Sequence, residues 1–291
     1  MMYHKEARSG YLFNLPIIFF AIAFFVVPIV GTIVTSFFQD VTFLPRKFIG
    51  LSNYKQLSSD PYFWQSGRFT ILFVLVSVTL ELVLGMIFAL ILNEKFRLRG
   101  LLRVSILIPW AIPIAISARI WQLIYNYSYG LFNFLTIQLG ITTAPINWLG
   151  TPIAAFFAIV ISDVWKTVPF MTIILLTGLS AIPEVLYKQA MVDGCNFYQR
   201  FRYITLPLLK PVVIVALLFR TIDALRIFDL VYVLTGGGPG GTTNSLSLYA
   251  YNYFLTGDFG YGSAVSVVIF LLAFILSITY IKLGRFRETM A

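Results

Sequence analysis

Long apolar runs, separated by short polar stretches, dominate the 291 residues of the chain. A helix that crosses a lipid bilayer needs about 20 mostly apolar residues in succession. The pattern therefore predicts an all-α fold with six transmembrane helices. The six runs cover residues 11–38, 69–93, 104–125, 152–179, 207–234 and 261–281. The first run is too long for a secretory signal and no A-x-A-like cleavage site follows it, which favours a retained span.

The basic residues predict the orientation of these spans, because cytoplasmic loops are enriched in Lys and Arg. With the N-terminus inside, and Lys210 at the start of the fifth run counted with the loop before it, thirteen of the 21 basic residues fall on the cytoplasmic side, four on the opposite side and four deeper within the runs. Both termini are therefore expected in the cytoplasm. We divide the chain into a tail, first helix and external loop (1–68), a core of five helices (69–284) and a cytoplasmic tail (285–291).

Composition supports the membrane class and excludes others. Hydrophobic residues make up 59% and charged residues 11%, against about 25% charged residues in an ordinary soluble domain. A single cysteine, Cys195, excludes a disulfide framework, and a single histidine, His4, makes a His-based catalytic pair or metal site improbable. The net charge of +9 follows from the loop asymmetry and indicates no nucleic-acid partner. We expect an integral membrane protein that is no enzyme and holds no metal.

The connection between the fourth and fifth runs, residues 180–206, has the pattern of two short amphipathic helices. An apolar stripe begins at Pro183, which suits a first helical turn, and reaches Gly194, which suits a helix end. Asn196 can cap a second helix, with Gln199 in the capping-box position. The stripe consists of Pro183, Leu186, Tyr187, Ala190, Met191 and Gly194. Spacing alone fits a protein-docking element and a helix resting on lipid headgroups equally well.

The same loop carries the motif of a known family. Gly194 is followed by nine residues and then by Ile204-Thr205-Leu206-Pro207. With this spacing, residues 182–211 resemble the EAA loop of the permeases of binding-protein-dependent ABC importers. The E-A-A positions carry Lys188, Gln189 and Ala190, so the acidic residue of the family pattern is replaced.

Two further segments resemble one branch of that family. Residues 228–262 are similar to the exit of span five and the external loop of the carbohydrate branch, the maltose and glycerol-3-phosphate permease type. The segment 50–54, with the sequence GLSNY, fits the same branch. Together with the six predicted spans, the resemblance covers nearly the whole chain.

The resemblance implies how such a chain would be driven. In the family the EAA loop seats in a groove of a separate ATPase subunit. The residues that would carry this role are Glu184, Tyr187, Lys188, Gln189, Ala190, Asp193, Gly194 and Pro207. The sequence has no Gly-Lys pair and so no phosphate-binding P-loop. We therefore expect no cofactor on this chain, and ATP and Mg on the partner ATPase dimer.

A glycine-rich run follows the fifth apolar run on the predicted external side. It includes Gly236, Gly237, Gly238 and Pro239. Without side chains, such a run can approach another backbone closely or form a flexible hairpin. The resemblance favours contact with an external solute-binding protein, since the loop is longer than a turn requires.

Charged residues inside the runs are the candidates for a substrate path. A charge at the bilayer centre costs about 2.5–3.5 kcal/mol on insertion scales, so each needs a partner or water. The candidates, with two aromatic residues beside them, are Asp223, Arg226, Asp229, Asp163, Trp121 and Tyr125. Salt bridges between helices are the alternative. Asp163 and Lys166, three residues apart, are predicted to pair with each other, and Glu81 stands alone in its run.

The expected function is that of a multi-pass permease subunit in the plasma membrane, importing a sugar or oligosaccharide at the expense of ATP. The partners implied by the resemblance are a second, homologous permease, an ABC ATPase dimer, an external solute-binding protein and membrane lipid. An ion-coupled secondary transporter of a small polar solute is the alternative, which the in-span charges would also suit. A requirement for ATP or for an ion gradient distinguishes the two.

Overall fold

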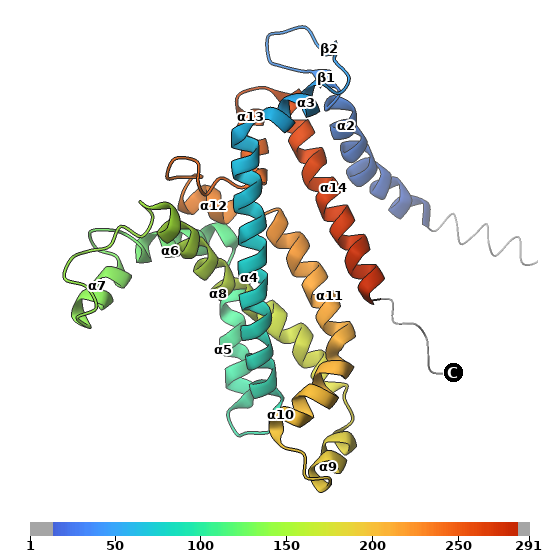
Figure 1. The fold of residues 1–291 in the computed structure, drawn as a ribbon. Helices are drawn as coiled ribbons and strands as arrows, with labels where there is room; N and C mark the ends of the chain where they lie inside the picture. The colour runs from blue at the N-terminus through green and yellow to red at the C-terminus, as the bar shows by residue number, and fades with distance from the viewer. Residues whose placement is uncertain (1–13, 285–291) are drawn as a thin grey trace, which may run out of the picture. The chain divides into compact units, whose positions relative to one another are not determined.

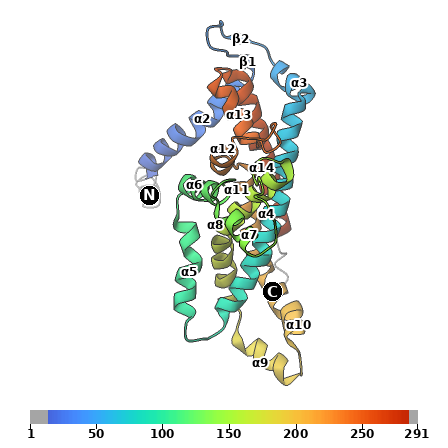
Figure 2. The ribbon, with the colours of Figure 1, turned by 90° about the vertical axis from the view of Figure 1, so that its left-hand side faces the viewer.

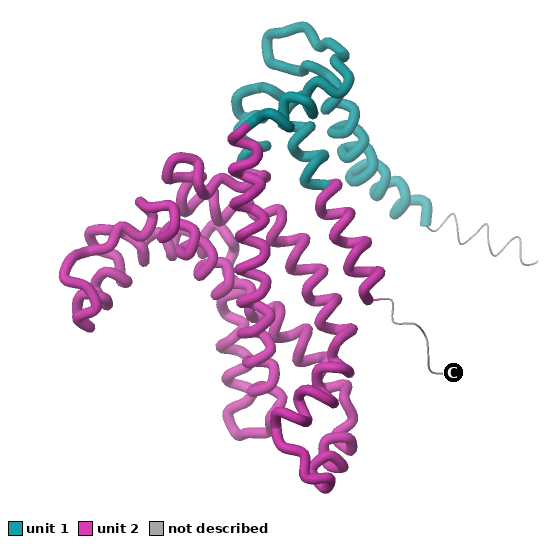
Figure 3. The backbone as a smooth tube through the Cα atoms, in the orientation of Figure 1, with its two compact units in different colours: residues 1–60, 249–270 teal, residues 61–248, 271–291 magenta. Residues whose placement is uncertain are grey.

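The computed structural model describes residues 14–284, and these are largely helical (Figure 1). The chain divides into two compact units (Figure 3). The first comprises residues 1–60 and 249–270, and the second comprises residues 61–248 and 271–291. The predicted all-α, polytopic class is confirmed.

The core of the second unit is built from three helices, α4 (Pro61–Asn93), α8 (Pro152–Ser180) and α11 (Leu206–Leu225), with α4 packing most extensively on α8. Glycines allow this close approach. A Cβ at Gly85 of α4 would lie 2.6 Å from the Cγ of Met171, and one at Gly178 of α8 would lie 2.6 Å from the Cδ1 of Leu209. Small residues are common at helix interfaces in membranes. Lipid is as apolar as the helix surfaces, so no hydrophobic effect drives helices together, and close packing of their backbones contributes instead.

Four described helices are long and apolar enough to cross a membrane. They are Asn14–Thr35, Pro61–Asn93, Pro152–Ser180 and Phe259–Gly284. A fifth candidate is a bent pair, α5 (Arg99–Ala111) and α6 (Ile114–Ile124). Helix α11 has 20 residues but carries Lys210, Arg220 and Asp223, which makes it the most highly charged of the expected spans.

Two runs that we expected as single helices are broken. Between α5 and α6 the chain turns by 94°. Pro113 cannot donate a backbone hydrogen bond, and it biases Ile112 towards the extended conformation that the structure shows, with ψ 131°. The fifth run ends as α11 at Leu225 and resumes as α12 (Asp229–Leu234), because Arg226 and Phe228 leave helical geometry. The expectation of continuous helices over 104–125 and 207–234 was wrong.

The connection 180–206 forms the expected helical corner at one end of the second unit (Figure 2). Helix α9 (Glu184–Val192) ends before Gly194, whose φ of +78° suits glycine. Helix α10 (Phe197–Arg200) starts with a complete capping box between Asn196 and Gln199, as predicted. A π-helical turn (Phe201–Thr205) leads into α11. Pro183 is the N-cap of α9 rather than a member of its first turn.

The remaining elements of the second unit are short. Helix α7 (Leu131–Gln138) lies in the connection between α6 and α8. Its Asn133 is buried and holds that connection together: Nδ2 donates to the carbonyl oxygen of Ile146 at 3.0 Å, and Oδ1 accepts from Trp148 Nε1 at 2.9 Å. The indole of Trp148 is therefore fixed within this connection by Asn133.

The first unit contains a π-helical turn (Ile22–Val26), α2 (Val27–Thr35), α3 (Ser52–Ser59) and a two-stranded hairpin of β1 (Phe38–Gln39) and β2 (Lys47–Phe48), in which Phe38 pairs with Phe48. Helices α13 (Leu246–Leu255) and α14 (Phe259–Gly284) lie partly in this unit. Asp60 accepts hydrogen bonds from the hydroxyls of Tyr249 and Tyr261. Burial and the bond to Asp60 raise the pKa of Tyr249 well above its ordinary value, so its hydroxyl remains a donor.

Candidate functional site

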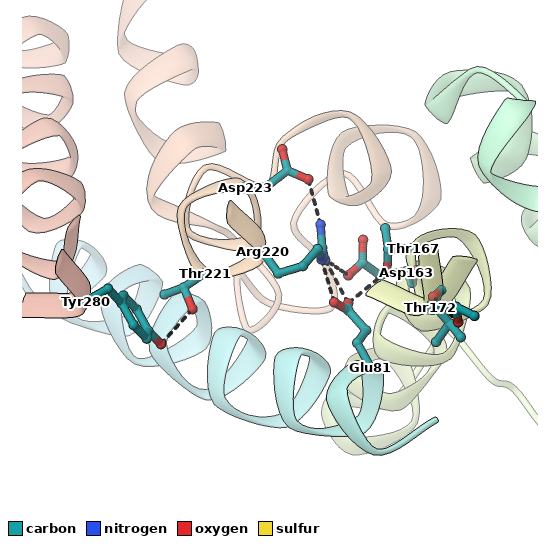
Figure 4. A network of polar contacts seen from close by, with 9 residues as sticks. Glu81, Asp163, Thr167, Thr172, Arg220, Thr221, Asp223 and Tyr280 are labelled. Carbon is teal, nitrogen blue, oxygen red and sulfur yellow. Dashed lines mark hydrogen bonds and ion pairs between the residues drawn. The ribbon is translucent and has the colours of Figure 1, made fainter. Parts of the chain in front are cut away.

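A buried ion network joins the three core helices (Figure 4). At its centre is Arg220 of α11, whose Nε donates to Glu81 Oε2 of α4 at 2.5 Å and whose Nη2 donates to Glu81 Oε1 at 2.7 Å. Nη2 also reaches Asp163 Oδ2 of α8 at 3.1 Å, and Nη1 reaches Asp223 Oδ2 at 2.6 Å. One guanidinium thus serves three carboxylates through its fixed fork of donors.

The centre of the network is closed off from solvent, whereas its edge is open. Glu81 and Arg220 are fully buried, and Thr167 donates a further hydrogen bond to Glu81 Oε1 at 2.8 Å. Asp223, by contrast, has 53% of its side chain exposed and forms a second pair with Arg226 at 3.4 Å, whose side chain is 69% exposed. Charge therefore alternates outward from a dry centre to an exposed rim.

The network shows that the predicted pairing of Asp163 with Lys166 was wrong, and it identifies the partner of Glu81. Asp163 pairs with Arg220 and not with Lys166, whose ammonium donates instead to backbone carbonyls at the end of α5. Glu81, alone in its run, has its cation on α11, 139 residues away along the chain. Its isolation within an apolar run was the one signal that a distant partner existed.

The six candidate path residues do not form one group. Asp163, Asp223 and Arg226 belong to the ion network. Asp229 is the first residue of α12, where a carboxylate interacts favourably with the positive end of the helix dipole. The remaining two, Trp121 and Tyr125, lie in a separate aromatic cluster.

In the aromatic cluster, Trp121 and Tyr125 stack at 5.3 Å between ring centroids, and Trp165 of α8 meets Trp121 edge-on at 5.7 Å. The centroid of the Phe132 ring lies 5.2 Å from that of Tyr125 and 6.0 Å from that of Trp121. Trp121 is 7% exposed and Tyr125 is 2% exposed, and the Tyr125 hydroxyl donates to the carbonyl oxygen of Ala158 at 3.2 Å. In the described state these rings pack α6 against α8.

The glycine-rich run is folded and not an open hairpin. Gly236, Gly237, Gly240 and Gly241 have positive φ angles, which side chains would resist. Threonines on either side of the run fix its path: Thr235 and Thr243 share a hydrogen bond of 2.8 Å between their hydroxyls, and Thr243 donates to the carbonyl oxygen of Gly238 at 2.5 Å. Gln65 of α4 donates to the carbonyl oxygen of Gly240 at 3.4 Å.

Beside this run lies a largely apolar cavity of about 810 Å³, lined by the first turns of α4 and α8 and by Thr242. Its charged residue is Arg68, at the level where the apolar part of α4 begins. None of the six candidate path residues lines it.

The helical corner at 180–206 presents apolar side chains outward. Val185, Met191 and Val192 are exposed, while Ala190 is buried. The corner is braced from within by the hydroxyls of Tyr187 and Thr205, 2.9 Å apart. At the replaced acidic position, Lys188 lies 3.9 Å from Glu184 one turn earlier, so the two charges offset each other.

Comparison with known proteins gives this geometry a context. Residues 81–283 match the family model of the binding-protein-dependent transport system inner membrane component. The match begins at Glu81 and includes the whole ion network and the helical corner. It confirms the resemblance read from the sequence and the multi-pass membrane location.

Individual relatives match over almost their full lengths. The chain is 57% identical over 286 residues to the trehalose/maltose transport system permease protein MalF of Thermococcus litoralis, covering 98% of this chain and 96% of that protein. It is 41% identical over 266 residues to the sulfoquinovosyl glycerol transport system permease protein SmoG of Agrobacterium fabrum, covering 90% and 86%. A crystal structure of a bacterial alginate ABC transporter, in complex with an alginate pentasaccharide-bound periplasmic protein, matches with a TM-score of 0.85 at 22% identity, covering 97% and 95%, and shows the same fold.

Proposed function

The chain belongs to the binding-protein-dependent transport system inner membrane components, and from this premise we propose that it is the sugar-translocating permease of an ATP-driven importer. The family is a transport component, so the chain is a permease and not an enzyme. The observation that carries the substrate class is the 57% identity to a trehalose/maltose permease over nearly the whole chain. We propose a disaccharide of that type as the substrate.

The helical corner is the proposed docking element for the ATPase. Its exposed Val185, Met191 and Val192 form an outward apolar face, which is unusual for a surface in water and typical of a protein contact. The residues proposed to seat in the ATPase groove are Glu184, Tyr187, Lys188, Gln189, Ala190, Asp193 and Gly194, with Pro207 in the first turn of α11. ATP and Mg would be bound by that partner.

We propose that α11 and α12 together make the fifth span, giving six spans with both termini in the cytoplasm. The charges of α11 need not oppose this, because Arg220 meets its carboxylates inside the helix bundle, where buried charges in membranes usually lie. The distribution of Lys and Arg supports the orientation. In the proposed orientation the corner would lie on the cytoplasmic side with the ATPase, and the glycine-rich run would lie outside.

The proposed external partner is a solute-binding protein that contacts Gly236, Gly237, Gly238 and Pro239. Gly236 is exposed, and the threonine bonds around the run give it a defined surface for a partner to recognise. The alginate transporter of the same fold was crystallised with its sugar-loaded periplasmic protein, which supports this arrangement. A second, homologous permease would complete the sugar path, with the exposed rim of Asp223 and Arg226 facing it.

The deciding experiment measures uptake of labelled trehalose and maltose by the purified complex in vesicles. We expect uptake only when ATP and a loaded binding protein are both supplied, on the faces that the orientation requires. Collapsing ion gradients with ionophores should leave the rate unchanged. Uptake that needs a gradient and ignores ATP would establish the ion-coupled alternative instead.

A further inference from the structure

Lys166 of α8 lies against the break between α5 and α6. Its ammonium donates to the carbonyl oxygens of Pro109 and Trp110, each at 3.4 Å, and to that of Ile112. Lys166 is buried, with 9% of its surface exposed. Among the described residues no carboxylate lies within ion-pair distance of it, since Asp163 is held by Arg220.

These contacts match what the break requires. A helix end leaves its last carbonyls short of intrahelical donors, and Pro113, which has no N–H, adds none. Of the three carbonyls, that of Pro109 also accepts from the backbone N–H of Ile112, at a long 3.4 Å. In the apolar part of a membrane such carbonyls must be satisfied by another group of the protein. A lysine ammonium has three donors and so meets three carbonyls at once.

The same turn of α8 also reaches the second broken span. Asp163, three residues before Lys166, bonds to Arg220 in the last turns of α11, just before that helix stops at Leu225. Beyond the two breaks, α6 and α12 pack against each other. One turn of α8 therefore contacts the first helix of each broken span, α5 and α11. The second helices, α6 and α12, pack against each other.

We propose that Lys166 is a positioning residue that fixes the angle between α5 and α6 by capping the exposed end of α5. The proposal deepens the permease function and rests on it, because the angle matters for transport only if the outer half-helices move between two states. The angle itself can be measured without transport. Failure of this inference and failure of the proposed function are thus distinguishable.

The test is a distance measurement across the break in the assembled transporter, reconstituted in lipid nanodiscs. Spin labels replace the exposed Val104 of α5 and Leu123 of α6, in a background in which the lone cysteine is changed by Cys195→Ser. With Lys166 present we expect one narrow distance. Lys166→Met, of similar length but without donors, should broaden the distribution and lower the ratio of bent to straightened molecules about tenfold, equivalent to about 1.4 kcal/mol.

Two variants separate positioning from mere charge. Lys166→Arg keeps several donors and should restore the narrow distance. Arg119→Met removes another in-span cation, which donates a hydrogen bond to Gln122 Oε1 of its own helix at 2.7 Å, and it should leave the distance unchanged. Lys166→Gln should broaden the distribution less than Met does, and it serves as the test if the Met variant does not assemble. An unchanged distribution in Lys166→Met or, failing that variant, in Lys166→Gln overturns the proposal.

A functional readout completes the test. Because the corner at 180–206 is untouched, Lys166→Met should keep binding-protein-stimulated ATP hydrolysis while sugar uptake falls about tenfold. Loss of both activities in an assembled complex would indicate a general structural role and count against positioning.

Discussion

Replacement of Arg220 should destabilise the protein more than replacement of any other residue of the ion network. Arg220→Met would leave Glu81 buried without its cation, and breaking a buried pair in this way costs about 3–5 kcal/mol. We expect a large fall in the yield of assembled complex and in its melting temperature. Arg226→Met is the matched control on the same segment, since its pair with Asp223 is exposed and should cost less than about 1 kcal/mol. Equal melting temperatures for the two variants would contradict a central role for Arg220.

The Asp223–Arg226 pair poses a different question, whether the exposed rim serves structure or the sugar path. If the pair only stabilises the fold, the double variant Asp223→Asn with Arg226→Gln should recover most of the uptake lost in either single variant. We expect the opposite. Asp223 also bonds to Arg220. The side chains of Asp223 and Arg226 are themselves largely exposed. The double variant should therefore assemble and hydrolyse ATP but not take up sugar. Uptake and ATPase activity of the three variants in vesicles decide between the two roles.

At this scale the sequence predicted that the in-span charges needed partners but not which partners they found. Helical spacing identifies neighbours three or four residues apart, and on that basis it paired Asp163 with Lys166. The actual partner of Asp163 lies 57 residues away, and that of Glu81 lies 139 residues away. Such contacts depend on how helices pack, and periodicity within one helix carries no information about that.

The elements illustrate the same division. The corner at 180–206 was predictable in detail, because its glycine end and capping box are local. Pro113 lies at the break between α5 and α6, but a turn of 94° also needs donors for the released carbonyls, and these come from Lys166 on another helix. The break after Leu225 has no proline near it. It had no local signal.

Gly194, between α9 and α10, gives a test of coupling at the scale of one element. A Cβ at Gly194 would meet nothing within 4 Å, so a branched side chain would not be blocked there by its neighbours. The φ of +78° is the constraint, because β-branched residues tolerate it poorly. Gly194→Val should insert normally yet lose uptake and stimulated ATP hydrolysis, as the corner between α9 and α10 shifts. Gly194→Asn, which tolerates this region, should retain most of both, and a fully active valine variant would remove the corner from the coupling path.

At the scale of the whole molecule, the chain exposes more apolar surface than one protein in water could, on its spans and on the corner. Lipid covers the spans, but Val192, 89% exposed at the end of α9, lies where we propose the ATPase to bind. Purification in mild detergent should therefore recover this chain with an ATPase and a second permease, and ATP hydrolysis should belong to the complex and be absent from the chain alone.

Val192→Asp places a charge in the proposed contact and should release the ATPase while the second permease stays bound. The subunits that remain after washing, identified by mass spectrometry, give the answer. Retention of the ATPase by the aspartate variant would move the docking surface away from this corner, and purification of the chain alone in a form that transports sugar would end the importer proposal itself.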